Sequence, residues 1–203
     1  AESWKPRLDA VRARLHAMDR LTWRRGTIAP EENHRWLVSS SDFGGDVDRF
    51  EAELNRAIAR AEAAPENPAV TSPDAVRLGY VGVPPIFSDL YAFLDSLGAP
   101  VVFNEVQRQF ALPEDGSDLV EAYRRYTYPY YVRGRVADIR REVKRRGLRG
   151  IVHYVQTFCH RALADTILRE ELDVPIITIE GHAPGPLEAS ARVRLESFVE
   201  MVR

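Results

Sequence analysis

Cys159 is the only cysteine among the 203 residues. Its thiol could act as a nucleophile or as a metal ligand. It follows a short apolar run at 151–155, typical of a buried strand, and precedes an expected helix at 161–171. A helix N-terminus lowers the pKa of a thiol and favours the thiolate. Because the thiolate both binds metals and attacks electrophiles, this position indicates a functional cysteine. A lone cysteine is also often a small buried apolar residue, and that alternative stays open.

As a nucleophile, Cys159 would take His160 or His182 as its base, with Glu180 to orient the base. That is the layout of a cysteine hydrolase. The strained elbow that presents such a nucleophile usually has glycines around it. Here Phe158 and His160 flank the thiol instead, which argues against a hydrolase.

As a zinc ligand, Cys159 would combine with His153, His160 or His182. No Cys-x-x-Cys or His-x-x-x-His spacing supports such a site. An isolated histidine is more often solvated or hydrogen-bonded. His153 lies in the middle of the expected strand, and we expect it to face a helix.

The composition describes an ordinary globular chain, with 45% hydrophobic and 29% charged residues. A net charge of −2 indicates no nucleic-acid or membrane partner. One cysteine excludes an internal disulfide framework and predicts a reducing, cytoplasmic location. No apolar run is long enough to span a bilayer. The sequence opens on Ala1 without an initiator Met, which suggests part of a longer protein.

The elements that must position Cys159 follow from the apolar pattern. Residues 1–64 show helical spacing, residues 65–75 are a proline-rich linker, and residues 76–203 alternate strands with helices. We expect strands at 76–83, 100–104, 151–155 and 175–179, with helices at 88–97, 119–147, 161–171 and 187–202. The long helical region is expected to divide near Tyr128-Pro129, because a residue before proline avoids helical geometry. This order predicts an α/β fold with a four-stranded parallel sheet of order 2-1-3-4, preceded by a helical region.

In an open α/β sheet, ligands bind at the carboxyl ends of the strands where the order reverses. The loop with Pro84 and Pro85 and the loop at 156–160 would therefore line a crevice, with the segment at 180–182 beside it. The Gly79–Gly82 stretch does not complete a dinucleotide fingerprint, and Pro84 and Pro85 remove two backbone donors.

Three further groups have less specific interpretations. The tryptophans Trp4, Trp23 and Trp36 are expected to pack between helices. The aromatic cluster at 123–131 is more typical of a core than of a cofactor site. The basic residues at 140–146 are expected to form a solvated helix face, with contact to an anionic group as the alternative.

Several motifs together resemble one known family. They are the run Gly150-Ile-Val-His-Tyr-Val-Gln-Thr-Phe-Cys-His-Arg, the stretch Leu172-x-Val-Pro-Ile-x-x-Ile-Glu-Gly, and Ala191-Arg-Val-Arg-Leu-Glu-Ser-Phe. Over residues 76–203 the chain resembles the C-terminal part of the 2-hydroxyacyl-CoA dehydratase and benzoyl-CoA reductase family, including the D-component of 2-hydroxyglutaryl-CoA dehydratase. The resemblance implies helical segments and flavodoxin-like or Rossmann-like α/β domains. His182 departs from the acidic residue expected after Glu180-Gly181.

The resemblance implies a [4Fe–4S] cluster held by three cysteines per subunit, of which Cys159 matches the C-terminal one. The other two would come from an earlier domain that this sequence does not include. In the family, one electron converts a 2-hydroxyacyl-CoA thioester to a ketyl radical anion that expels the hydroxyl. The electron comes from a separate ATP-dependent activator protein. The residues implied around cluster and substrate are Pro84, Pro85, Gln156, Thr157, Phe158, His160 and Glu180.

The sequence therefore predicts a subunit or C-terminal fragment of an iron–sulfur, radical-type 2-hydroxyacyl-CoA dehydratase or a benzoyl-CoA-reductase-like enzyme. Its expected partners are an acyl-CoA, a homologous subunit in a homo- or heterodimer, and the activator. The chain is not expected to catalyse alone. The alternative is a non-catalytic subunit or interaction domain of the same fold that lacks a complete cluster site.

Overall fold

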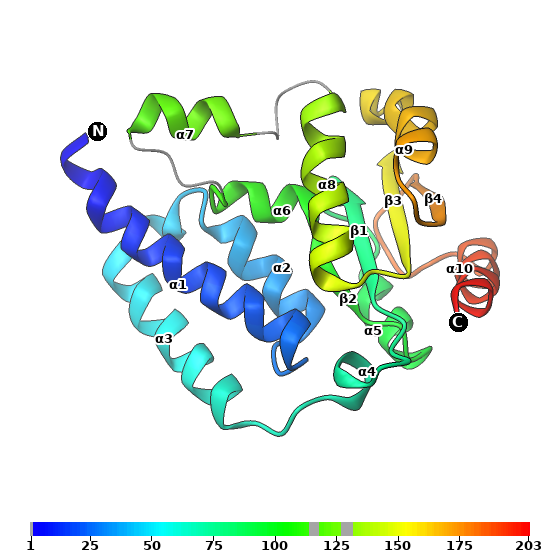
Figure 1. Cartoon of the computed structure of the whole chain (residues 1–203), viewed down its shortest axis with the longest axis horizontal. Coiled ribbons are helices and arrows are strands. Elements are labelled where there is room, and N and C mark those ends of the chain that lie inside the picture. Colours follow the sequence, from blue (N-terminus) through cyan, green and yellow to red (C-terminus); the bar gives the residue numbers. More distant parts are fainter. Residues whose placement is uncertain (1, 114–117, 127–131) are drawn as a thin grey trace.

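The N-terminal region is helical, as predicted. The computed structural model describes residues 2–113, 118–126 and 132–203 (Figure 1). Two short 3-10 turns, Glu2–Trp4 and Phe43–Gly45, accompany helices α1 (Lys5–Arg24), α2 (Pro30–Ser39) and α3 (Val47–Ala63). Prolines occupy the first turns of α1 and α2, where a missing N–H costs nothing, and the side chain of Asp46 accepts the backbone N–H of Arg49 to cap α3. These helices share a core of Val11, Leu15, Met18, Leu37 and Leu54.

The tryptophan prediction is correct in part. The ring of Trp36 packs edge-on against Phe50 with centroids 5.0 Å apart, between α2 and α3. Trp4 is 61% exposed, so its predicted burial is wrong. Trp4 lies in the short turn before α1, ahead of the stripe of Val11, Leu15 and Met18 through which α1 packs into the core.

A four-stranded parallel sheet forms the centre of the remaining chain. Its strands are β1 (Leu78–Gly82), β2 (Val101–Asn104), β3 (Gly150–Gln156) and β4 (Ile176–Gly181), in the order β2-β1-β3-β4. The α/β fold and the strand order are both confirmed. The strands β1 and β3 are buried along nearly their whole length, and their sequences are therefore mostly continuous apolar runs.

Helices cover both faces of the sheet. Side chains of α5 (Leu90–Ser96) and α10 (Ala189–Val202) pack on one face. Those of α8 (Val132–Arg146) and α9 (Asp165–Glu171) pack on the other, which Figure 1 shows with α8 and α10 on opposite sides. The predicted division of 119–147 is present as α7 (Leu119–Arg125) and α8, and its junction at Tyr128-Pro129 lies outside the described residues. A short helix that the sequence analysis did not predict, α6 (Glu105–Phe110), follows β2 directly.

The proline-rich segment at 65–75 contains a single helical turn, α4 (Pro68–Thr71). The backbone N–H of Asn67 donates to the carbonyl of Arg25 at 2.8 Å, which holds α4 beside the end of α1. The helical region also packs against the sheet side of the chain, through contacts of α2 with α6 and of α1 and α2 with β2. The division of the chain into two domains at this segment stays a prediction.

None of the helices in the described parts of the chain is long and apolar enough to cross a membrane.

Candidate functional site

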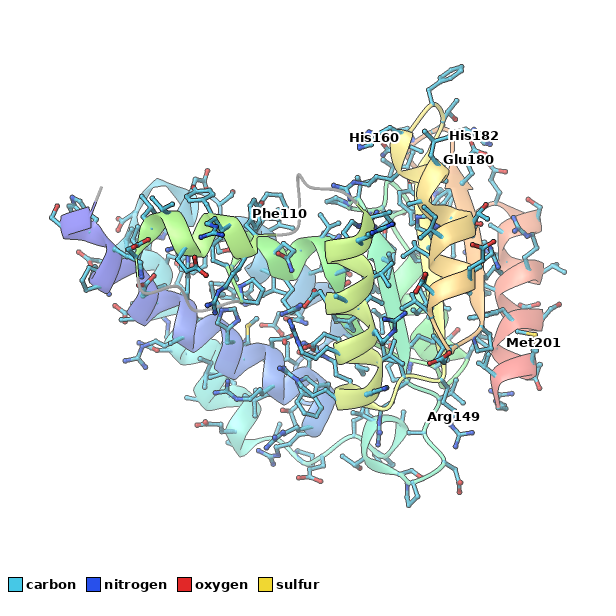
Figure 2. All side chains as sticks on the ribbon, turned by 45° about the horizontal axis from the view of Figure 1, so that its top comes forward. Phe110, Arg149, His160, Glu180, His182 and Met201 are labelled. Carbon is cyan, nitrogen blue, oxygen red and sulfur yellow. The ribbon has the colours of Figure 1, made fainter. Side chains whose placement is uncertain are left out.

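The carboxyl ends of β1, β3 and β4 bring the predicted site residues to one end of the sheet. Figure 2 shows His160, Glu180 and His182 gathered at this end, while Arg149, which precedes β3, lies at the opposite end. Strand register explains the gathering, because Gln156 of β3 pairs with Gly181 of β4. The loops that follow both strands therefore leave the sheet at the same level.

The loop after β3 turns sharply to place Cys159. The backbone N–H of Cys159 donates to the carbonyl of Gln156 at 2.8 Å, and that of Thr157 donates to Gly181 at 3.3 Å. Between them Phe158 has a φ of 62° and a fully exposed side chain. A bulky residue rarely adopts this left-handed conformation. The turn thus leaves Cys159 half-buried at the carboxyl end of the sheet, after the interior strand β3.

The predicted helix at 161–171 is wrong at its start. Cys159 precedes a 3-10 turn, His160–Ala164, and the α-helix α9 begins only at Asp165. The backbone N–H of Cys159 donates to the carbonyl of Gln156, so this N–H is not available to stabilise a thiolate. The argument that a helix N-terminus favours a thiolate at Cys159 therefore fails.

The three histidines considered as partners of the thiol make different contacts. The Nδ1 atom of His182 lies 2.5 Å from the hydroxyl of Thr157, and His160 is exposed, as is Glu180. His153 is fully buried, and its Nδ1 contacts Asp165 at 2.7 Å, so the prediction that it faces a helix is confirmed.

Burial lowers the pKa of His153 although Asp165 opposes the shift. In the described part of the chain, no histidine forms a hydrogen bond with the thiol, and no three His, Cys, Asp or Glu side chains group as a metal site. Neither the hydrolase arrangement nor the zinc arrangement is therefore assembled by these residues.

The proline loop after β1 is held beside the end of β3. Gly82 has a φ of 119°, and a Cβ there would lie 2.1 Å from the carbonyl oxygen of Tyr154. The backbone N–H of Ile86 donates to the Tyr154 hydroxyl at 3.2 Å. Tyr154 on β3 thereby holds the chain that contains Pro84 and Pro85 beside the end of β3.

A buried ion pair at the carboxyl end of β1 was missed by the sequence analysis. Arg135 of α8 donates two hydrogen bonds to Glu105, at 2.6 and 2.9 Å, and Glu105 also accepts the backbone N–H of Gly82 at 3.2 Å. Burial alone would raise the pKa of Glu105, but Arg135 outweighs it and holds the pKa below its usual value.

Burial likewise opposes the charge of Arg135, but Glu105, and to a smaller extent Cys159, hold the Arg135 pKa above its usual value. The signal in the sequence was the acidic residue directly after strand two, at the carboxyl edge where ligands bind.

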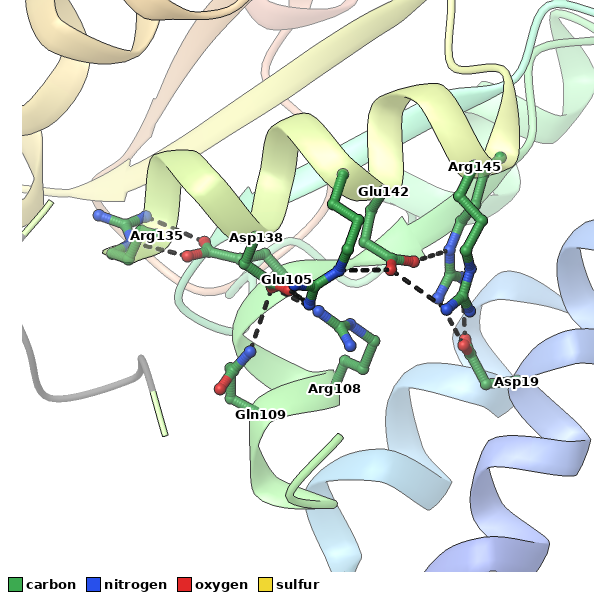
Figure 3. A network of polar contacts seen from close by, with 10 residues as sticks. Asp19, Glu105, Arg108, Gln109, Arg135, Asp138, Glu142 and Arg145 are labelled. Atoms are coloured by element: carbon green, nitrogen blue, oxygen red, sulfur yellow. Dashed lines mark hydrogen bonds and ion pairs between the residues drawn. The ribbon is translucent and has the colours of Figure 1, made fainter. Parts of the chain in front are cut away.

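The ion pair is one end of a network along α8 (Figure 3). Arg146 is fully buried and bonds Glu142 at 2.6 Å and Asp19 of α1 at 2.6 Å. Further along, Asp138 accepts from Arg108 and, at 3.2 Å, from Gln109. The prediction of a solvated basic face is therefore wrong for Arg146, because the acidic side chains that bury it come from α8 itself and from α1.

Comparison with known families agrees with this geometry. The family model of the 2-hydroxyglutaryl-CoA dehydratase D-component matches residues 8–202. The chain belongs to the 2-hydroxyglutaryl-CoA dehydratase D-component family. The match extends through α1–α3, so the helical region belongs to the family unit together with the α/β part. No curated protein matches the chain.

An iron–sulfur cluster expected in this D-component family is not completed by this chain. Such a cluster needs several thiolate ligands, and the sequence contains one cysteine. The half-buried thiol at an open sheet edge is suited to be one ligand of a cluster whose other ligands come from elsewhere. By themselves, the residues present do not form the site.

Proposed function

We propose that this chain is a component of a radical-type 2-hydroxyacyl-CoA dehydratase or of a benzoyl-CoA-reductase-like enzyme, and that Cys159 supplies one thiolate to its iron–sulfur cluster. The observation that carries the proposal is the position of the only cysteine. In a chain of the D-component family, it lies half-buried at the carboxyl edge of the sheet, where ligands bind in this class of fold.

The residues around Cys159 have distinct parts in this proposal. The turn at Thr157 and Phe158 presents the thiol at the sheet edge. The Glu105–Arg135 pair fixes the end of β1 through the backbone N–H of Gly82.

The remaining predicted residues are proposed to lie around this centre. Gln156 and Glu180 belong to the last residues of β3 and β4, His160 follows Cys159, and Pro84 and Pro85 follow β1. In the proposal these residues limit water access and contact the acyl-CoA. A bound cluster would supply one electron at low potential, a chemistry that no side chain provides.

The proposal requires partners. The missing thiolates would come from polypeptide outside this sequence, and the acyl-CoA thioester is the proposed substrate. A homologous subunit and a separate ATP-dependent activator complete the proposed system. A cytoplasmic location follows from the proposed low-potential chemistry.

The alternative is a non-catalytic subunit of the same fold, which binds partners without a cluster. It is favoured by the single cysteine in the sequence and by the lack of a grouped metal site among the residues the structure describes.

Iron analysis separates the two functions. The protein is purified without oxygen, together with any natural upstream segment and partner subunit, and its iron and acid-labile sulfide are measured. About four irons per polypeptide are expected for a [4Fe–4S] cluster, with loss of most of this iron in the variant Cys159→Ala. The control variant Ser197→Ala, on an exposed position of α10, keeps the iron.

Unchanged iron in Cys159→Ala would remove the ligand role of Cys159. No iron in the unaltered protein would exclude the cluster and leave the non-catalytic alternative.

A further inference from the structure

We propose that a second site, a cavity between the end of α1, α4 and the end of α5, binds a monovalent alkali cation, with potassium as the test ion. The cavity has a volume of about 230 Å³. It reaches Pro100 and Val101, at the amino end of β2. Because Cys159 lies at the carboxyl end of the sheet, this proposal does not depend on the function proposed above.

Two threonine hydroxyls that have no hydrogen-bond partner among the described residues line the cavity. Thr22, in the last turn of α1, is 1% exposed, and its Oγ1 atom is buried without a partner. The Oγ1 atom of Thr27, just after α1, is also buried without a hydrogen-bond partner among the described residues. A buried polar atom left without a partner costs on the order of 1–3 kcal/mol. A ligand that both oxygens can bind would remove this cost.

Among the described residues that line the cavity, one has a carboxylate and none has a basic side chain. Asp95 belongs to the last turn of α5, and the structure gives its carboxylate no ion pair or hydrogen bond among the described residues. Burial of part of this side chain raises the pKa of Asp95 to about 6, because no positive charge compensates it. A helix C-terminus carries a partial negative charge, so α5 does not stabilise this carboxylate either.

The end of α1 adds to the negative potential. The 20 residues of α1 direct the negative end of their dipole toward Thr22 and the turn at Gly26 and Thr27. The nearest arginine of this turn is engaged elsewhere, because Arg25 donates to Glu66 and to the carbonyls of Glu62 and Ala64. The cavity therefore has oxygen atoms and a negative field but no cation of its own.

The donor set favours a monovalent ion. Calcium sites usually contain several carboxylates, and magnesium is usually bound through carboxylates together with substrate phosphates, whereas this cavity has one carboxylate among its described lining residues. One carboxylate with neutral hydroxyl oxygens balances a single positive charge. The cavity is also too small for a large organic cation together with its hydration water, since one water takes about 30 Å³ of liquid volume.

Thermal unfolding of the full chain tests the site. The unfolding midpoint is measured in potassium chloride, in sodium chloride and in choline chloride at equal ionic strength. At a cation concentration about tenfold above its dissociation constant, binding to the folded state raises the midpoint by roughly 3–5 °C over choline. Asp95→Asn and Thr22→Val are expected to abolish this rise. Asp173→Asn, an exposed acidic residue after α9, is the matched control and keeps it.

Each outcome decides the proposal. Equal midpoints in all three salts would show that the cavity holds only water. A full potassium effect in Asp95→Asn would also overturn the site. If Thr22→Val fails to fold, Asp95→Asn still decides, because Asp95 is at the surface and its replacement removes only the charge.

Discussion

Two neighbouring regions of this molecule treat charge in opposite ways. Along α8, buried arginines and carboxylates satisfy one another within the interior, from Asp19 to Glu105 (Figure 3). At the end of that network, the loop at 156–160 exposes Phe158 completely and leaves Cys159 half-buried. Arg146, Asp19 and Glu142 of the first region are buried, whereas Phe158 of the second is fully exposed to solvent.

The two regions therefore differ in which substitutions they tolerate. A buried ion pair tolerates no loss of one partner, because the remaining charge stays in a medium of low dielectric constant. An exposed loop loses little packing when a side chain changes. The network therefore fixes α8 to the helical region and to the sheet. The exposed loop can change its side chains with little loss of stability. Three predictions test this contrast.

The largest loss of stability is expected for Arg146→Met. The change leaves Asp19 and Glu142 buried without their shared partner, and it removes the hydrogen bond to the Val102 carbonyl. The expected cost is about 4 kcal/mol in the free energy of unfolding, measured by urea denaturation. Arg145→Met is the control, because Arg145 is 46% exposed and bonds Glu142 at 3.4 Å. It is expected to cost less than about 1 kcal/mol, and equal losses in both variants would contradict a buried network.

A smaller effect, dependent on pH, is expected for Glu105→Gln. The pKa of Glu105 is lowered in the folded chain, so its ion pair contributes stability above the unfolded-state pKa and loses it as pH falls below about 4.5. The unaltered chain should therefore lose stability in acid.

The variant should be less stable at pH 7 by about 3 kcal/mol, since Arg135 stays buried alone. Its stability should also fall less steeply below pH 4.5. Urea midpoints between pH 7 and 3 measure both, and parallel pH curves for the two proteins would refute the assignment.

The smallest effect is a gain in stability for Phe158→Gly. The Phe158 side chain is fully exposed and its φ is 62°, so glycine relieves the backbone conformation without loss of packing. A gain of about 1 kcal/mol is expected in the free energy of unfolding. Phe43→Gly is the matched control, because Phe43 has a φ of 55° but is only 5% exposed and packs on Phe50. It should lose about 2 kcal/mol or more, and a loss of similar size in Phe158→Gly would indicate hidden packing at the loop.

Much of the fold was readable from local pattern. Buried parallel strands give short apolar runs, and helices give a spacing of three to four residues, so the elements and the order of the sheet followed from the chain itself. The rule that ligands bind at carboxyl ends then placed Cys159, Glu180 and the proline loop at one end of the sheet. The roles assigned to these residues stay predictions.

The α/β class, the order of the strands and the end of the sheet at which Cys159 lies all follow from the sequence, because they depend on periodicity and chain order. The partners of the charged residues depend instead on tertiary packing. Arg146 meets Asp19 across 127 residues, and Arg135 meets Glu105 across 30. A charged residue that faces water and one that faces a buried partner look alike in a sequence. Only the packing of α8 against α1 and α6 shows which arginines of α8 are buried.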